Sequence, residues 1–112
     1  MNKTRLGEEE KILFSAVWYK DLIPAKEDLP LLHYLPKNLD KGICLYGLRH
    51  GQCIYTRVAL NGKRDSECGE SVQGFLSNCN IFYTRSEAAI LHVKNGGKLH
   101  YSTVDLYSED LY

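Results

Sequence analysis

The side chains best suited to chemistry are two arginines and a histidine near expected helix starts. Arg49 and His50 follow a short apolar run and precede an expected helix, and Arg85 follows Thr84 at the start of another. Backbone N–H groups at a helix start favour an anion, and arginine or histidine can add charge-assisted hydrogen bonds to a phosphate. We therefore expect Arg49, His50 and Arg85 to bind a phosphorylated ligand.

Aromatic residues near Arg85 could recognise a flat ring. Phe82 and Tyr83 directly precede Thr84, and Phe75 lies in the apolar run before them. Successive strand residues point to opposite faces, so one of the pair enters the core while the other could stack on a base. Core packing is the simpler interpretation for Phe82, and the same ambiguity holds for Phe75. The chain also has eight tyrosines, whose rigid, amphipathic rings suit interfaces and flat ligands.

The acidic C-terminal stretch DLYSEDLY supplies possible partners for the arginines. We expect it to dock, because four large side chains in seven residues should not all remain exposed: Leu106, Tyr107, Leu111 and Tyr112. Docking would bring Glu109 and Asp110 near Arg49 or Arg85. Two interpretations stay open, since arginine suits carboxylates and phosphates alike. In the first interpretation the arginines bind a phosphorylated ligand, and in the second they pair with the carboxylates of the tail. Alternatively, the tail contacts a second chain.

Enzyme and metal sites have weaker support. The histidines at 33, 50, 92 and 100 and the cysteines at 44, 53, 68 and 79 show no close ligand pairs, so we expect no metal and no cofactor. A zinc site using Cys44 and His50 stays open, as does a Cys–His nucleophile using Cys53, three residues after His50. His50 could also act as an acid or base with Glu109 or Asp110.

The size and charge of the chain exclude several classes of protein. Its 112 residues predict one domain with a small core, which an oligomer interface would supplement. The 14 basic and 14 acidic side chains give no net charge, so bulk attraction to nucleic acid or to an anionic membrane is not expected. No apolar stretch approaches the roughly 20 residues of a membrane span, and the polar N-terminus does not resemble a secretory signal. We expect free cysteine thiols and a homo-oligomer.

Apolar runs, turn residues and capping signals predict the elements that must position these side chains. We expect strands at 12–19, 43–47, 71–76, 81–83 and 99–104, and helices over 48–62 and from 84 to about 95. Asn61-Gly62 ends the first helix, and a Thr84/Glu87 capping box starts the second. The SNCN turn joins two of the strands as a hairpin, with Asn78 and Asn80 suited to left-handed conformations.

The remaining segments complete the predicted domain of residues 1–112. Residues 1–11 are polar and expected to be flexible. Residues 20–42 contain prolines at 24, 30 and 36, which favour an extended excursion over a helix. Residues 105–112 form the docked acidic tail. This order predicts an α+β fold: a mostly antiparallel sheet with two helices packed on one face.

Several short segments together resemble a family of small proteins encoded by bacteriophages and prophages. They are, in order, Arg49-His50, Glu70, residues 73–76 (QGFL), Phe82, residues 84–89 (TRSEAA) and residues 106–112 (LYSEDLY). The resemblance covers most of the chain from residue 43 onward. The chain differs from it at Gly51, where the family often has a second histidine, and at Ile81, where it often has an arginine.

The resemblance implies a phage protein in the bacterial cytoplasm and gives no established reaction. Small phage proteins commonly counter host defence, some of them by sequestering nucleotide signals, which serves here as an analogy. Three functions remain open. They are a binding protein that sequesters a phosphorylated ligand, a module that inhibits a host protein, and a nucleotide-directed hydrolase. Without an evident general base and partner, we expect a non-enzymatic binding protein.

Overall fold

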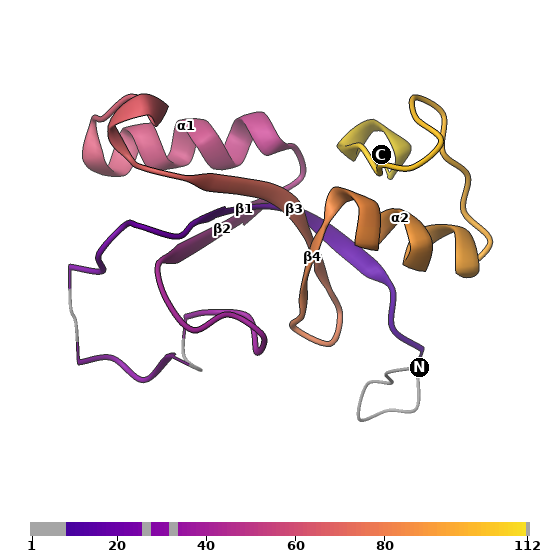
Figure 1. The fold of residues 1–112 in the computed structure, drawn as a ribbon, viewed down its shortest axis with the longest axis horizontal. Coiled ribbons are helices and arrows are strands. Elements are labelled where there is room, and N and C mark those ends of the chain that lie inside the picture. Colours follow the sequence, from indigo (N-terminus) through magenta and orange to yellow (C-terminus); the bar gives the residue numbers. More distant parts are fainter. Residues whose placement is uncertain (1–8, 26–27, 32–33, 112) are drawn as a thin grey trace.

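The computed structural model describes residues 9–25, 28–31 and 34–111 (Figure 1). The elements, in chain order, are β1 Ile12–Tyr19, β2 Ile43–Gly47, α1 His50–Asn61, η2 Asp65–Glu67, β3 Ser71–Ser77, β4 Phe82–Thr84, α2 Arg85–Lys94 and η3 Ser108–Asp110, where η denotes a 3-10 helix. The first two strands have the predicted bounds, and the other predicted strands up to β4 and both helices are correct to within one or two residues.

The four strands form one antiparallel sheet in the order β2-β1-β3-β4 (Figure 1). The central strand β1 pairs with β2 on one side and β3 on the other, so that Ser15 lies opposite both Gly47 and Phe75. The predicted β3–β4 hairpin is present, and Asn80 in its turn has the left-handed backbone conformation with φ 61°. These observations confirm the α+β class and the antiparallel sheet.

Both helices pack on the same face of the sheet, as predicted. Val17 and Tyr19 of β1 pack against Cys53 of α1. Phe75 of β3 packs against Ala88 and Ala89 of α2. Since Phe75 lies opposite Ser15, two residues before Val17, these side chains share one face. Figure 1 shows α1 and α2 over opposite ends of this sheet.

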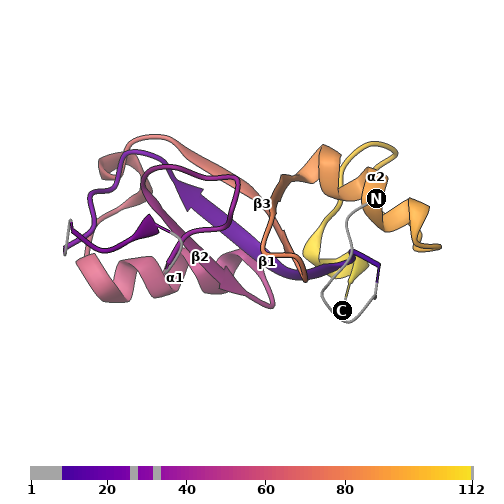
Figure 2. The same ribbon diagram turned by 90° about the horizontal axis from the view of Figure 1, so that it is seen from below.

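The described part of the 20–42 excursion covers the other face. Leu35, which is 2% exposed, packs against Ala16, Cys44 and Phe82 on that face. Figures 1 and 2 show this segment at the α1 end of the molecule, away from α2. The excursion therefore completes the core, which explains where some of its leucines pack. His33 lies outside the described residues.

The side chain of Asn38, in the same excursion, closes one edge of the sheet. Its Oδ1 accepts a 2.9 Å hydrogen bond from the backbone N–H of Phe82, and its Nδ2 donates a 2.7 Å hydrogen bond to the Phe82 carbonyl. An amide placed this way imitates the backbone of a further strand. The outer edge of β4 at Phe82 is therefore already paired.

The predicted strand at residues 99–104 is wrong. No strand forms there, and Tyr101 and Val104 are 67% and 64% exposed. Asn38 occupies the edge of β4 at Phe82, so this segment does not extend the sheet there. Figure 1 shows the C-terminal segment running beside α2 instead.

Glu10 belongs to the packed part of the fold, whereas the sequence assigned it to a flexible segment. It is 2% exposed, and its carboxylate accepts hydrogen bonds from Ser77 Oγ at 2.6 Å and Tyr83 Oη at 2.7 Å. Residues 1–8 of the predicted flexible segment lie outside the described residues. The tail is docked as far as it is described, since Leu106 is fully buried. Tyr112 is outside the described part.

The buried stripe of α1 consists of polar and sulfur-containing side chains rather than aliphatic ones. The apolar residue Leu60 lies on the exposed side of the helix and is 75% exposed. His50, Cys53 and Arg57 are buried instead. Gly62, with φ 67°, ends the helix as predicted.

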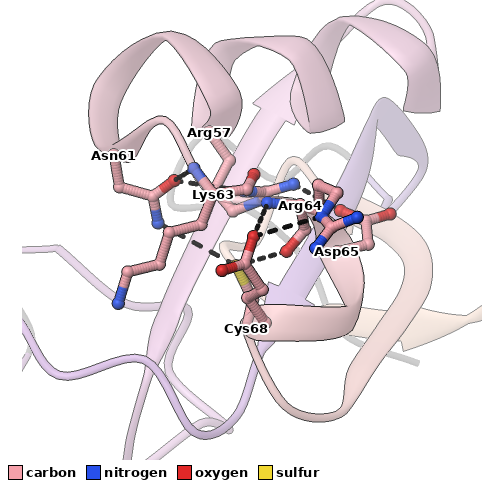
Figure 3. A network of polar contacts seen from close by, with 7 residues as sticks. Arg57, Asn61, Lys63, Arg64, Asp65 and Cys68 are labelled. Atoms are coloured by element: carbon pink, nitrogen blue, oxygen red, sulfur yellow. Dashed lines mark hydrogen bonds and ion pairs between the residues drawn. The ribbon is translucent and has the colours of Figure 1, made fainter.

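Arg57 is buried because it ties the end of α1 to the following loop (Figure 3). Its guanidinium donates to Asn61 Oδ1 at 3.1 Å, to the Lys63 carbonyl and to the Asp65 carboxylate. The guanidinium carbon also lies 5.2 Å from the centre of the Tyr19 ring. Arginine therefore serves here as a core residue, with its charge matched by Asp65 and its carbon chain packed on the sheet.

In the part of the chain that the structure describes, no helix is long and apolar enough to cross a membrane.

Candidate functional site

The predicted site residues that meet in space surround Arg85. We call the group the Arg85 cluster and define it by His50, Gln73, Arg85, Leu106, Tyr107 and Ser108. Arg85 Nη2 donates to Gln73 Oε1 at 2.6 Å, and Nη1 donates to the Leu106 carbonyl at 3.0 Å. The guanidinium carbon lies 4.7 Å from the centre of the Tyr107 ring, an arrangement that permits a cation–π interaction.

Local capping places Arg85 at the first position of α2. Thr84 Oγ1 accepts the Glu87 N–H at 3.3 Å, and Glu87 Oε1 accepts the Thr84 N–H at 3.0 Å, which confirms the predicted capping box. Leu106 N–H donates to the Arg85 carbonyl at 3.0 Å and holds the tail against this turn. Since the Glu87 carboxylate already occupies the helix start, an anion would meet the Arg85 guanidinium rather than the backbone N–H groups.

The hydrogen-bond and ring partners of Arg85 are all uncharged in the described part of the chain. They are a side-chain amide, a backbone carbonyl, a phenol ring and, at 3.4 Å, the imidazole Nδ1 of His50. None of the described carboxylates forms a salt bridge with Arg85. Arg85 does contact the tail, but through the backbone carbonyl of Leu106. It does not pair with the carboxylates of Glu109 or Asp110. The guanidinium therefore keeps a positive charge that an anion could neutralise.

His50 is the buried support of the cluster. It is 7% exposed, and its Nε2 lies 2.8 Å from the Gly74 carbonyl. Because a carbonyl only accepts, Nε2 carries the proton, and Nδ1 accepts from Ser108 Oγ at 3.0 Å and from Arg85. Burial lowers the pKa of His50, the Arg85 charge lowers it further, and the Gly74 carbonyl and Glu109 oppose the shift. The neutral imidazole is thus the form that the fold favours.

This geometry does not support the acid–base role considered for His50. Both ring nitrogens are occupied by hydrogen bonds within the protein. Asp110 accepts the backbone N–H groups of His100 at 2.8 Å and Tyr107 at 3.0 Å, so it caps the tail. Glu109 is exposed. The two carboxylates thus organise and border the tail rather than forming a catalytic pair with His50.

The aromatic residues expected to stack on a base lie elsewhere. Phe75 is fully buried and meets His50 edge-on at 5.0 Å between ring centres. Phe82 is 5% exposed and packs against Trp18 on the opposite face of the sheet. Tyr83 is partly buried and donates its hydroxyl to Glu10. The first two offer no open ring face, so their expected stacking role is not supported, and Tyr83 is tied into the core.

The ring that borders Arg85 is that of Tyr107, which was not among the aromatic residues expected to stack on a base. Tyr101, which is 67% exposed, meets the Tyr107 ring at 6.3 Å between ring centres. Gln73 was also not singled out as a site residue. The abundance of tyrosine and the LYSEDLY ending were signals for this region, but they did not show which rings would meet Arg85.

Arg49 occupies the N-cap position of α1, next to His50. The N–H groups of Leu48 and Arg49 donate to Gln52 Oε1 at 2.9 Å and 3.2 Å, so a glutamine amide caps this helix. The Arg49 side chain is partly buried. Its position after β2 and before α1 agrees with the predicted junction.

The cysteines do not form the alternative sites considered. Cys44 packs on the sheet face opposite the helices, whereas His50 lies on the helix face, so the two cannot share a zinc ion. Burial raises the pKa of Cys53 to about 11 and that of Cys44 to about 12, so both thiols stay protonated and are poor nucleophiles. All four cysteines are free. The described residues contain no group of three or more metal-ligating side chains.

Comparison with known families identifies the chain as a small phage protein. The family model described as "Phage T4 y16D protein" matches residues 31–112. The match covers well over half of the chain, so the chain belongs to the phage T4 y16D protein family. It confirms the resemblance to a small phage family, while the particular residue pattern stays a prediction. No curated protein and no solved structure gives a significant match.

Proposed function

We propose that this phage protein is a non-enzymatic counter-defence protein that acts in the bacterial cytoplasm. In this proposal it binds a small phosphorylated ligand at the Arg85 cluster and withholds a nucleotide signal from host defence. The observation that carries the proposal is the Arg85 guanidinium, which is held in place by uncharged partners and has no described carboxylate to neutralise it. A phosphate would supply the missing negative charge through charge-assisted hydrogen bonds.

The neighbouring rings suggest why the ligand would be a nucleotide. Tyr107 lies beside Arg85, and the largely exposed Tyr101 meets the Tyr107 ring edge-to-face. A base could stack on an exposed tyrosine while its phosphate meets the guanidinium, and such stacking contributes roughly 1–3 kcal/mol per base. Arg49 and His50 were expected to join this site. In its neutral form, His50 contacts Arg85 from the buried side of the cluster and so helps to position it. Arg49 is retained as a candidate phosphate ligand.

A thermal-shift screen of the full chain with mono-, di- and cyclic nucleotides tests this proposal. Ligands that bind the folded state raise the midpoint of unfolding, and the shift grows with ligand concentration. The informative variant is Arg85→Gln, which removes the charge but keeps amide donors near Leu106. The matched control is Arg64→Gln, because the Arg64 side chain is 85% exposed and lies in the loop after α1.

The proposal predicts a shift that disappears in Arg85→Gln and persists in Arg64→Gln. Tyr101→Ala should weaken binding of a nucleotide more than binding of inorganic phosphate. The same shift in all variants would place the ligand elsewhere, and no shift with any nucleotide would reject nucleotide binding. Ligand recovered chemically unchanged after heat release would exclude the hydrolase.

One observation favours the second candidate function, inhibition of a host protein. A groove of about 620 Å³ runs between α2 and the segment after it, and it is almost entirely apolar. Ile90, Val93 and Val104 on its walls are 72%, 51% and 64% exposed. If no nucleotide binds, a purified host protein retained by the wild type but not by Ile90→Lys would support this candidate.

A further inference from the structure

The two edges of the sheet differ in whether their outward backbone groups have hydrogen-bond partners among the described residues. On the β4 edge, the Asn38 amide pairs with the N–H and C=O of Phe82. On the β2 edge, the backbone of Ile43–Gly47 pairs with β1, and no backbone or side-chain hydrogen bond from the other described residues reaches its outer side. Alternate residues of β2 therefore direct outward N–H and C=O groups that no other described residue pairs.

The sequence of β2 lacks the features that usually protect an open edge. From Gly42 to Leu48 it reads GICLYGL, with no charge and no proline. Natural edge strands are commonly guarded by lysine, proline, a bulge or a covering loop. Tyr46 and Leu48 are 41% and 51% exposed. An uncharged edge strand of this kind is a template for pairing with another strand.

A shallow apolar groove adjoins the same edge and enlarges the surface. It holds about 290 Å³ and is lined by Phe14, Tyr46, Gly47, Leu48 and Leu76. By the sheet register, Tyr46 lies opposite Ala16 and Leu76 lies opposite Phe14, which places these side chains on the face away from the helices. Strand pairing at β2 could therefore be accompanied by apolar packing on one side of the new sheet.

We propose that β2 is a dimerisation strand, which pairs antiparallel with β2 of a second copy and joins two four-stranded sheets into one. A second copy suits this edge because antiparallel pairing of identical strands obeys two-fold symmetry. The N–H groups of each β2 then meet the C=O groups of the other. The uncharged run allows this pairing without like charges facing one another in its centre. The paired run itself carries no charge. Its contacts would be backbone hydrogen bonds and apolar packing, so added salt should not dissociate the dimer.

The mass of the full chain in solution, measured by light scattering and sedimentation over a range of concentrations, tests the proposal without any ligand. The wild type should be a dimer. Tyr46→Lys should raise the dimer dissociation constant by about tenfold or more, because it places like charges across the strand pair and removes apolar contact. The matched control is Ile90→Lys, which adds the same charge in the α2 groove and should leave the dimer intact.

Further measurements separate this interface from other outcomes. If Tyr46→Lys does not fold, Leu48→Lys beyond the strand end serves the same purpose. Hydrogen exchange of the β2 amides should slow as the protein concentration increases. A monomer at every concentration would overturn the proposal, as would a dimer that Ile90→Lys breaks and Tyr46→Lys does not. The result is independent of nucleotide binding, so either proposal can fail without the other.

Discussion

His50 Nδ1 and Ser108 Oγ lie 3.0 Å apart, although 58 residues separate them in the chain. This hydrogen bond joins the first residue of α1 to the docked C-terminal tail, and the Gly74 carbonyl holds the other side of the same imidazole. The histidine thus connects a helix, a strand and the tail. The stability of this junction depends on one neutral ring.

The first prediction is that stability falls as the pH is lowered through this histidine's titration. The pKa of His50 is lowered in the fold, mainly by burial, while an unfolded histidine titrates near about 6.5. Below that pH the unfolded chain binds a proton that the folded chain resists, so the free energy of unfolding should decrease until the folded pKa is passed. Urea unfolding at a series of pH values measures this. The dependence should flatten in His50→Gln and persist in His100→Gln, whose ring is at the surface; an unchanged profile in His50→Gln would assign the effect to other groups.

The second prediction concerns the tail. Leu106 is fully buried beside Phe75, Ala88 and Ala89, so Leu106→Ala should lower the free energy of unfolding by about 2–5 kcal/mol. Val104→Ala, two residues earlier and 64% exposed, should change it by less than about 0.5 kcal/mol. Chemical denaturation compares the two variants. Equal, small effects would mean that the tail contributes little to the core.

The third prediction is that Asn38 protects the β4 edge. Asn38→Ala leaves the N–H and C=O of Phe82 without their partners, which should cost about 1–3 kcal/mol. It should also promote concentration-dependent aggregation, because an edge is exposed. Asn38→Asp keeps the acceptor and loses the donor, so its effect should be intermediate. Light scattering together with urea unfolding checks both effects, and a fully stable, non-aggregating Asn38→Ala would contradict this role.

The fourth prediction explains the glycine in QGFL. A Cβ at Gly74 would overlap the Tyr83 carbonyl oxygen and lie 2.7 Å from Cζ of Phe82, so Gly74→Ala should force β3 and β4 apart. We expect a loss of about 3 kcal/mol, at the upper end for overpacking. Gly51→Ala is the control, because a Cβ there meets no atom within 4 Å and alanine favours the helix. Thermal unfolding should show opposite shifts for the two variants; a stable Gly74→Ala would mean that the hairpin can adjust.

The sequence alone was sufficient for features that depend on neighbouring residues. The Thr84/Glu87 capping box, the Gly62 helix end and the left-handed Asn80 all follow from contacts or torsions within a few positions, and the local apolar runs marked the bounds of β1 and β2. The order of the predicted elements, with the expected hairpin, was enough to predict a mostly antiparallel sheet. The position of Arg85 at a helix start was also predictable, because the cap that creates it is local.

Only the tertiary structure decided which side chains meet and which edges are closed. Arg57 rather than Leu60 is buried because Tyr19 and Asp65 are brought beside it, and Asn38 rather than residues 99–104 pairs with the edge of β4 at Phe82. Tyr107 rather than Phe75 faces Arg85 because the tail folds back over α2. These outcomes depend on contacts between residues that are far apart in the sequence. A local sequence pattern does not specify which distant residues will be in contact. The sequence therefore determined the elements and their ends, whereas the packing of the chain against itself determined the candidate site and the open edge of β2.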